Sequence, residues 1–316
     1  MKLVRDLAEF PQALRGGAVS IGNFDGVHLG HASIVSKLIT AARRVSGPAV
    51  VFTFDPHPVR LLRPAETPPP LTWTDRKAEL LGELGVDCMV AYPTNQELLQ
   101  LSADEFFEQI VRDQLAAQAM VEGPNFFFGR NREGTIERLE AMCQAARIEL
   151  SVVQPVRAGE EFVSSSRVRR LLADGDVEQA AAMLTRPYRL RGMVTHGASR
   201  GTQLGFPTAN VDAVDTIVPA LGVYAGLAHT GGAPWPAAVN LGPNPTFGED
   251  ARKLEVHLIG WQGSLYGQPL EVDFLQRLRD IRRFDGVDEL LVQLRRDVAQ
   301  AHDVAVDYLQ QSGRPQ

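Results

Sequence analysis

His28 and His31 lie three residues apart in a glycine-rich segment, residues 22–31, which follows a short apolar run at 18–21. The run predicts a buried strand, and the segment after it predicts the start of a helix. Glycines at such a turn let backbone N–H groups approach an anion, and the helix presents its positive dipole end there. Imidazoles on one helical turn share a face, so both histidines could contact one triphosphate while its α-phosphorus is attacked. A pair of surface or metal-binding histidines is the alternative.

Three further segments of the first half could contribute to a ligand site. Residues 54–58, Phe-Asp-Pro-His-Pro, end a strand in a stiff aromatic rim, although a simple turn has the same pattern. Residues 123–129 place three consecutive aromatic side chains between two glycines, which suits either a flat ligand ring or a plug for the core. Residues 164–169 offer three serine hydroxyls at a helix start with arginines behind them, which suits a clamp for pyrophosphate. Ordinary helix capping would explain only one of these serines.

The second half carries a different phosphate motif at 197–210, a glycine-rich loop that leads into Pro-Thr-x-Asn. No Walker loop occurs in the sequence, so we expect backbone amides and a metal to hold phosphate there. The Thr208 hydroxyl and the Asn210 amide are hard oxygen ligands that suit Mg²⁺, and a turn of a β-barrel is the alternative. Glu255 lies on a strand whose other face is apolar, so its carboxylate could accept a proton from a hydroxyl nucleophile. Many strand glutamates, however, are simply solvated.

In this order, the first-half segments resemble the adenylyltransferase domain of the bacterial bifunctional riboflavin kinase/FAD synthetase family. The family pattern Gly-x-Phe-Asp-Gly-x-His-x-Gly-His matches residues 22–31, and Phe-x-Pro-His-Pro matches residues 54–58. The pattern Gly-x-(Asp or Asn)-Phe-x-Phe-Gly matches residues 123–129, with a less usual proline before the amide. The last pattern, Ile-Ser-Ser-Thr-x-Ile-Arg, reads Val-Ser-Ser-Ser-Arg-Val-Arg at 163–169, so Ser166 keeps the hydroxyl of the commoner threonine.

The second-half segments 197–210, 240–247 and 265–267, together with Glu255, resemble the riboflavin kinase module of the same family. The resemblance therefore covers nearly the whole chain. It implies that the second half transfers the ATP γ-phosphoryl group to riboflavin. It also implies that the first half adenylylates the resulting FMN with ATP, which gives FAD and pyrophosphate. ATP, riboflavin and FMN would then be the small-molecule partners, with Mg²⁺ as the cofactor.

The resemblance also implies roles for single residues. Glu255 would be the kinase base, and His28, His31 and Arg169 would stabilise charge during adenylyl transfer. The residues implied to bind ATP for adenylylation are Gly22, Asn23, Phe24, His28, His31, Ser165, Ser166 and Arg169. Those implied to bind the flavin for adenylylation are Phe54, Pro56, Pro58 and Asn125. Those implied to bind ATP in the kinase are Gly197, Gly201, Gly205, Thr208 and Asn210, with Thr208 and Asn210 also as metal ligands.

The elements that must position these residues change in character near residue 187. Before it, apolar β-branched runs alternate with helical segments, which predicts an α/β domain with a Rossmann-like parallel sheet. Ligands of such sheets bind at the carboxyl ends of the strands, where three of the first-half motifs fall. After it, short strand-like segments predict a small antiparallel β-barrel covered by a C-terminal helix at about 287–309. We therefore expect an adenylyltransferase domain at 1–186 and a riboflavin kinase domain at 187–316.

Strands and helices can be assigned to particular segments from apolar periodicity and capping signals. First-half strands are expected at 18–21, 49–54, 86–91 and 120–122, and helices at 76–84, 101–115 and 168–184. Barrel strands are expected at 190–195, 222–229, 237–241, 254–260 and 270–274.

Composition argues against several classes of protein. The 316 residues are 44% hydrophobic and 22% charged, which is typical of a soluble globular chain with two domains. A net charge of −6, without a Lys/Arg run interleaved with aromatics, argues against nucleic acid as a partner. No signal-peptide core or apolar run of membrane-spanning length is present, so we expect a cytoplasmic protein without a membrane partner. Cys88 and Cys143 are expected to be reduced core residues.

Two other functions are compatible with parts of the sequence. A different adenylyl- or cytidylyltransferase, acting on a sugar-like or lipid head-group phosphate, would leave residues 197–210 without a role. A non-catalytic flavin or nucleotide regulator would keep the binding loops but would be expected to lose His28, His31 or Glu255. All three residues are present. Only the bifunctional enzyme would form both FMN and FAD from riboflavin and Mg-ATP.

Overall fold

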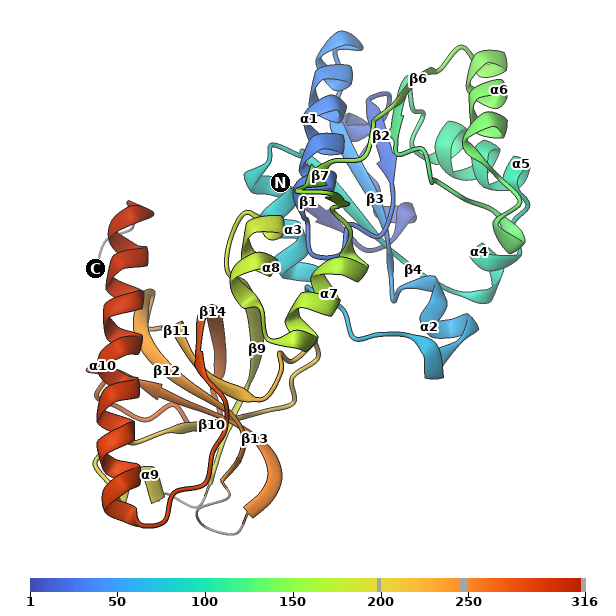
Figure 1. Cartoon of the computed structure of the whole chain (residues 1–316). Helices are drawn as coiled ribbons and strands as arrows, with labels where there is room; N and C mark the ends of the chain where they lie inside the picture. Colours follow the sequence, from blue (N-terminus) through green and yellow to red (C-terminus); the bar gives the residue numbers. More distant parts are fainter. Residues whose placement is uncertain (198–199, 245–248, 314–316) are drawn as a thin grey trace. The chain divides into compact units, whose positions relative to one another are not determined.

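The structure is a computed structural model that describes residues 1–197, 200–244 and 249–313. The chain forms two compact units (Figure 1). The first consists of Met1–Pro68 and Thr72–Ser164, and the second consists of Pro69–Leu71 and Ser165–Gln316. Three residues of the first half, Pro69–Leu71, therefore pack with the second unit.

The first unit is built on a six-stranded parallel sheet in the order β1-β4-β3-β2-β5-β6. Its strands are β1 (Lys2–Val4), β2 (Ala18–Ile21), β3 (Ala49–Asp55), β4 (Cys88–Pro93), β5 (Ala119–Glu122) and β6 (Glu149–Val152). From the central β2, the chain adds β3 and β4 on one side and β5 and β6 on the other. The direction of winding therefore reverses between β2 and β5, which is where such sheets bind ligands.

Helices cover both faces of this sheet (Figure 1). Val51 packs on one face with residues of α1 (Leu29–Arg44) and α3 (Thr74–Glu83). Its neighbour Phe52 packs on the other face with α5 (Ala103–Phe106), the π-helical segment Phe107–Gln114 and α6 (Ile136–Ala146). Because both faces are buried, the strands have almost continuous apolar sequences. The remaining elements are α2 (Pro58–Leu62), α4 (Gln96–Gln100), the hairpin of β7 (Arg157–Ala158) and β8 (Glu161–Phe162), and 3-10 turns at Leu7–Glu9, Gln12–Leu14, Pro64–Glu66 and Arg130–Arg132.

The second unit is built on a closed antiparallel barrel in the order β10-β13-β12-β11-β14-β9. Its strands are β9 (Tyr188–Thr195), β10 (Ala209–Asp212), β11 (Gly222–Thr230), β12 (Ala233–Asn244), β13 (Glu249–Leu258) and β14 (Pro269–Arg279). A short helix, α9 (Arg200–Gln203), lies between β9 and β10. Closure pairs each of these six strands with a neighbour on both sides.

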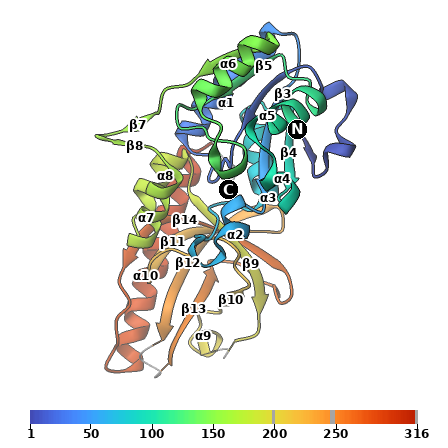
Figure 2. The ribbon, with the colours of Figure 1, turned by 90° about the vertical axis from the view of Figure 1, so that its right-hand side faces the viewer.

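Helices pack on the outside of the barrel. Figure 2 shows α10 (Val287–Gln311) alongside β11, β12 and β14. Leu309 of α10 packs with Leu227 of β11 and Leu275 of β14. The helices α7 (Ser165–Asp174) and α8 (Val177–Leu184) also belong to this unit, and α8 contacts β9 and β14.

The predicted fold class is confirmed in both units. The structure adds β1, β6 and β10, for which the sequence analysis assigned no strand. The predicted helical segment at 168–184 is two helices, because Gly175 takes a left-handed φ of +82° and Asp176 caps α8. Cys88 and Cys143 are free thiols buried in the core of the first unit, as expected.

Candidate active sites

The first candidate site lies where β2 ends. Pairing of β2 with β5 stops after Val19 and Met120, so the sheet opens at its carboxyl edge. Beyond that point, the Ile21 N–H donates to the Glu122 side chain at 2.7 Å. Burial raises the pKa of this carboxyl well above its usual range. Because the pairing of β2 with β5 ends before the loop from β2 to α1 begins, this loop starts where β2 and β5 separate.

This loop has a strained backbone. Phe24 and Val27 have φ of +47° and +42°, in addition to Gly26 at +84°. The left-handed region is especially unfavourable for a β-branched residue such as Val27. Both Phe24 and Val27 are buried. Strain of this kind persists only where the surrounding structure fixes the backbone, and it is commonest at functional sites.

The structure brings the predicted residues of 22–31 together at the first turn of α1. The His28 and His31 rings stack with centroids 3.7 Å apart, and His28 caps α1 by accepting a hydrogen bond from the His31 N–H. The Phe24 ring lies 5.1 Å from the His31 ring. The buried Oδ1 of Asn23, which directly follows Gly22, has no hydrogen-bond partner in the part of the chain that the structure describes. A ligand with a donor group would satisfy this oxygen.

The residues expected to contact the flavin lie at the end of β3 and in the segments that follow β3 and β5, the strands that flank β2. Phe54 is half-buried near the end of β3, and Pro56 follows it. Pro58 is the first residue of α2, and Asn125 is exposed after β5. The predicted flavin residues therefore share the carboxyl edge of the sheet with the loop after β2.

The three aromatics after β5 have different environments. Phe126 and Phe128 stack with ring centroids 5.3 Å apart, and Phe128 also packs near Phe106 in the core. Phe127 is exposed, with the Arg132 guanidinium 4.4 Å above its ring. The alternative of a core plug is therefore right for two of the three side chains.

Ser165, Ser166 and Arg169 lie on α7 and belong to the second unit. The Arg169 Nε–H donates to the Pro69 carbonyl oxygen at 3.1 Å, within that unit. His28 and His31 belong to the first unit, so their joint action with α7 on one triphosphate stays a prediction.

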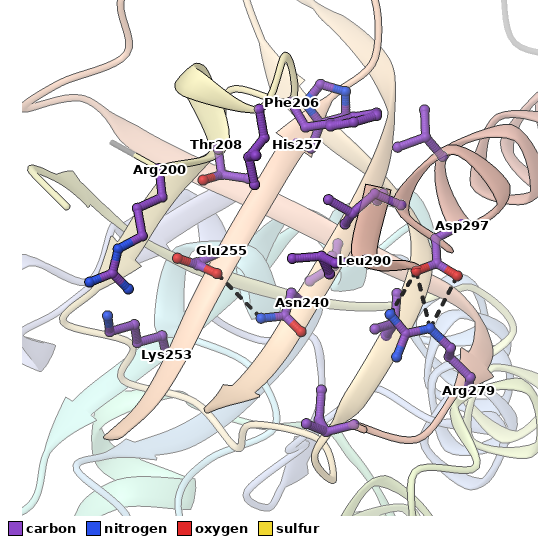
Figure 3. Close-up of a pocket in the computed structure, with 18 of the residues that line it drawn as sticks. Arg200, Phe206, Thr208, Asn240, Lys253, Glu255, His257, Arg279, Leu290 and Asp297 are labelled. Atoms are coloured by element: carbon purple, nitrogen blue, oxygen red, sulfur yellow. Dashed lines mark hydrogen bonds and ion pairs between the residues drawn. The ribbon is translucent and has the colours of Figure 1, made fainter. Parts of the chain in front are cut away.

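The second candidate site is a pocket of the barrel unit (Figure 3). Arg200, Thr208, Lys253 and Glu255 gather on one side of it. Apolar side chains line the other side, where α10 contributes Leu290, Leu294 and Val298. This division suits a ligand that carries phosphate at one end and an apolar ring at the other.

Glu255 of β13 lies between two asparagines. In the strand register it pairs with Asn210 of β10 on one side and with Asn240 of β12 on the other, so the three side chains share one face of the barrel. The Asn240 Nδ2 donates to the Glu255 Oε2 at 3.3 Å (Figure 3). Residues Leu254 and Val256, on the opposite face of β13, are buried in the core. The Glu255 carboxylate is thus held in the pocket in a position suited to accept a proton.

The predicted glycine-rich loop forms part of this pocket. A Cβ on Gly201 would lie 2.3 Å from the Phe206 carbonyl oxygen, so only glycine allows this close approach. Gly201, Thr208 and Asn210 line the pocket, whereas Gly197 and Gly205 shape the loop beside it. Residues 198–199 of this motif, and 245–247 of the segment at 240–247, lie outside the described residues.

The oxygen donors in the pocket fit Mg²⁺. Thr208, Asn210 and Glu255 provide a hydroxyl, an amide and a carboxylate oxygen in one wall. The described ranges contain no group of three or more His, Cys, Asp or Glu that could hold a metal. Mg²⁺ commonly binds through one or two carboxylates together with substrate phosphates. The donor set therefore suits Mg²⁺ that arrives with a nucleotide triphosphate.

An ion pair between the half-buried Arg279 and the buried Asp297 fixes the wall that α10 contributes. The Arg279 Nη2 lies 2.7 Å from the Asp297 Oδ2, and the Gln293 Nε2 donates to the Asp297 Oδ1 at 2.7 Å. Both partners of the ion pair line the pocket. The pair joins β14 to α10 and so holds the apolar wall against the barrel.

Sequence reasoning missed several pocket residues. Lys253 and His257 could have been found from Glu255, because alternate residues of a strand share a face. The His257 ring donates from Nδ1 to the Pro207 carbonyl oxygen at 2.7 Å and so supports the turn before Thr208. Arg200 lies within the predicted loop at 197–210 and could have been found from its position beside Gly201. The Arg279–Asp297 pair gives no local signal, because separate segments bring its two residues to the pocket.

Comparisons with known proteins match both halves of the chain. The FAD synthetase family model matches residues 10–167, and the riboflavin kinase family model matches residues 184–305. A bifunctional riboflavin kinase/FMN adenylyltransferase from Pseudomonas fluorescens is 38% identical over 96% of this chain and 98% of its own length. The protein of the same description from Escherichia coli K12 is 33% identical over 96% of this chain and 97% of its own.

A solved structure shows the same architecture. It is described as a macrolide-efflux protein from Streptococcus pneumoniae and is 30% identical, with a TM-score of 0.82 over 93% of this chain and 96% of that one. The efflux description concerns that protein. Among the described residues here, no helix has both the length and the apolar character needed to cross a membrane. The chain belongs to the family of bifunctional riboflavin kinase/FMN adenylyltransferases, and with ATP it converts riboflavin to FMN and FMN to FAD.

Proposed function

We propose that riboflavin is phosphorylated in the barrel pocket and that FMN is adenylylated at the loop between β2 and α1. The position of Glu255 between Asn210 and Asn240, in one pocket with Thr208, carries the first assignment. We assign the adenylyltransferase to residues 1–186 and the kinase to residues 187–316. The family matches at 10–167 and 184–305 support these limits.

In the kinase reaction, Glu255 accepts the proton of the riboflavin 5′-hydroxyl as that oxygen bonds to the γ-phosphorus of ATP. The bond from the γ-phosphorus to its bridging oxygen breaks, and ADP leaves. Thr208 and Asn210 would hold Mg²⁺, which supplies positive charge beside the phosphates when bound. Arg200 and Lys253 add positive charge at the same end of the pocket. Gly197, Gly201 and Gly205 shape the loop that receives ATP.

In the adenylyl transfer, an oxygen of the FMN phosphate attacks the α-phosphorus of ATP directly. The bond between the α-phosphorus and the bridging oxygen breaks, and pyrophosphate leaves. His28, His31 and Arg169 stabilise the charge on the triphosphate during this step. Gly22, Asn23, Phe24, Ser165 and Ser166 position the triphosphate, and Phe54, Pro56, Pro58 and Asn125 contact the isoalloxazine.

The partners follow from these reactions. We propose that the protein works in the cytoplasm, where ATP is supplied, and that it acts on small molecules without nucleic acid. The net charge of −6, without a Lys/Arg run interleaved with aromatics, supports the assignment of small molecules and not nucleic acid as partners.

Two variants test the residue assignments, because each reaction is the internal control for the other. Glu255→Gln should slow FMN formation by about 10²- to 10⁴-fold, while supplied FMN is still converted to FAD. His28→Ala should slow FAD formation by about 10²- to 10³-fold, so FMN should accumulate from riboflavin and Mg-ATP. Flavin chromatography measures both products, after circular dichroism has shown that each variant is folded. A folded variant that makes its product at the wild-type rate would remove that residue from the site.

A further inference from the structure

Lys77 is a buried lysine that the reaction steps above do not use. It lies on α3, where its neighbours Asp75 and Glu79 are exposed, yet only 9% of Lys77 is exposed. Burial lowers the pKa of Lys77, while the Asp25 and Asp55 carboxylates favour its charged form. Burying an ammonium group is costly unless the group is paired, so the contacts of Lys77 require an explanation.

The Lys77 side chain reaches the strained loop after β2. Its Nζ donates to the Asn23 carbonyl oxygen at 2.7 Å, and the Thr53 hydroxyl of β3 donates to the same oxygen at 3.2 Å. Two residues further on, the Asp25 Oδ1 accepts from the N–H and the hydroxyl of Thr72 at 3.1 and 3.2 Å. The loop is thus fixed from behind by β3 and by the residues at the start of α3.

These contacts determine the direction of one peptide plane. The Asn23–Phe24 peptide is trans, so its carbonyl oxygen and its N–H point in opposite directions. Because Lys77 and Thr53 hold the carbonyl, the Phe24 N–H points away from both. In the ranges that the structure describes, this N–H donates to no oxygen. A backbone N–H that is fixed and unused in a loop with left-handed residues is a donor for an anion.

We propose that Lys77 is a positioning residue for FMN adenylylation, because it fixes the Asn23–Phe24 peptide so that the Phe24 N–H can donate to the triphosphate beside His28. This inference rests on the proposed adenylylation site at the same loop. Lys77 acts through the backbone, and its charge also helps to hold Phe24 and Val27 in their left-handed conformations. The same lysine on the solvent side of α3 would have neither effect.

Lys77→Met tests the proposal, because methionine keeps most of the side-chain volume and removes the donor. The turnover number for FAD formation per folded molecule should fall about 10- to 100-fold, the value of a charged hydrogen bond. The KM for FMN and the rate of riboflavin phosphorylation should stay near wild type. The thermal midpoint should not fall much, because the substitution also removes the cost of burying a charge. The matched control, Lys37→Met on the exposed face of α1, should change neither reaction.

A second substitution separates positioning from a merely structural role. Thr53→Val removes the other donor to the Asn23 carbonyl. The loss of turnover in the double variant with Lys77→Met should therefore differ from the product of the two single losses. Wild-type turnover in folded Lys77→Met, or a loss that only follows the folded fraction, would overturn the proposal. If His28→Ala slows FAD formation but Lys77→Met does not, the positioning role of Lys77 is refuted and the adenylylation site is not. If both variants make FAD normally, the adenylylation site itself is misassigned.

Discussion

The stability of the kinase unit should depend on α7 and α8, although they precede the boundary at residue 187. Two fragments, residues 165–316 and 187–316, differ only by this pair of helices. Both contain every residue that lines the pocket, so both should phosphorylate riboflavin when folded. Only the longer fragment keeps the contacts of α8 with β9 and β14.

The size of the difference follows from the side chains that these helices bury. Leu172, Val177, Met183 and Leu184 are each exposed by 2% or less. Four such side chains correspond to about 6–12 kcal/mol if each contributes about 1.5–3 kcal/mol. Part of this area is buried between α7 and α8, and denatured chains are already partly compact, so about 3–6 kcal/mol remains. That is a large share of the ~5–15 kcal/mol typical of a domain.

Urea unfolding followed by tryptophan fluorescence measures this difference. Trp235 and Trp261 pack edge to face 5.2 Å apart in the barrel unit, and the third tryptophan, Trp73, lies in neither fragment. The midpoint for residues 187–316 should be lower by at least about 1 M urea. Riboflavin phosphorylation at low temperature confirms that each fragment folds. Equal midpoints would show that α7 and α8 do not stabilise the barrel.

Two further predictions concern buried charges. Glu122→Gln keeps an oxygen that accepts from the Ile21 N–H. Burial raises the folded-state pKa of Glu122. In the wild type, the stability that the protonated Glu122 side chain contributes is therefore fully present near pH 4, and it is lost as the pH rises towards that pKa. Urea unfolding should therefore show little difference near pH 4 and a growing advantage for the variant towards about pH 8, and a constant difference would contradict this reasoning. Asp273→Asn removes the buried carboxylate that is the main partner of the half-buried Arg189, and it leaves Glu271. The free energy of unfolding should therefore fall by about 3 kcal/mol, while kcat for riboflavin is unchanged. An unaltered urea midpoint would show that this ion pair does not contribute.

Apolar patterning was sufficient to predict both folds. Continuous apolar runs such as residues 49–54 require a sheet that is covered on both faces, and α1, α3, α5 and α6 provide that cover. Segments such as 222–229 and 270–274 have strand length between turn residues, and both became barrel strands. The α7–α8 break could have been predicted too, because Gly175 followed by Asp176 is a helix stop followed by a cap.

Pairings between distant segments could not be predicted in this way. Asn210 and Asn240 meet Glu255 only because the barrel closes with one particular register. Lys77 follows Asp75 and Arg76 in a helix, a pattern typical of a solvated face. Its burial depends on the path of the loop after β2, which follows from the fold and not from helical periodicity.

The thiols of Cys88 and Cys143 can report the opening of the first unit. Burial raises the pKa of Cys88 to about 11 and that of Cys143 to about 12. Both therefore remain protonated and shielded at neutral pH, and alkylating reagents should modify them only when this unit opens. The barrel unit contains no cysteine, so labelling of the intact enzyme follows the opening of the first unit alone. A nucleotide that binds the closed first unit should slow this labelling in proportion to its saturation.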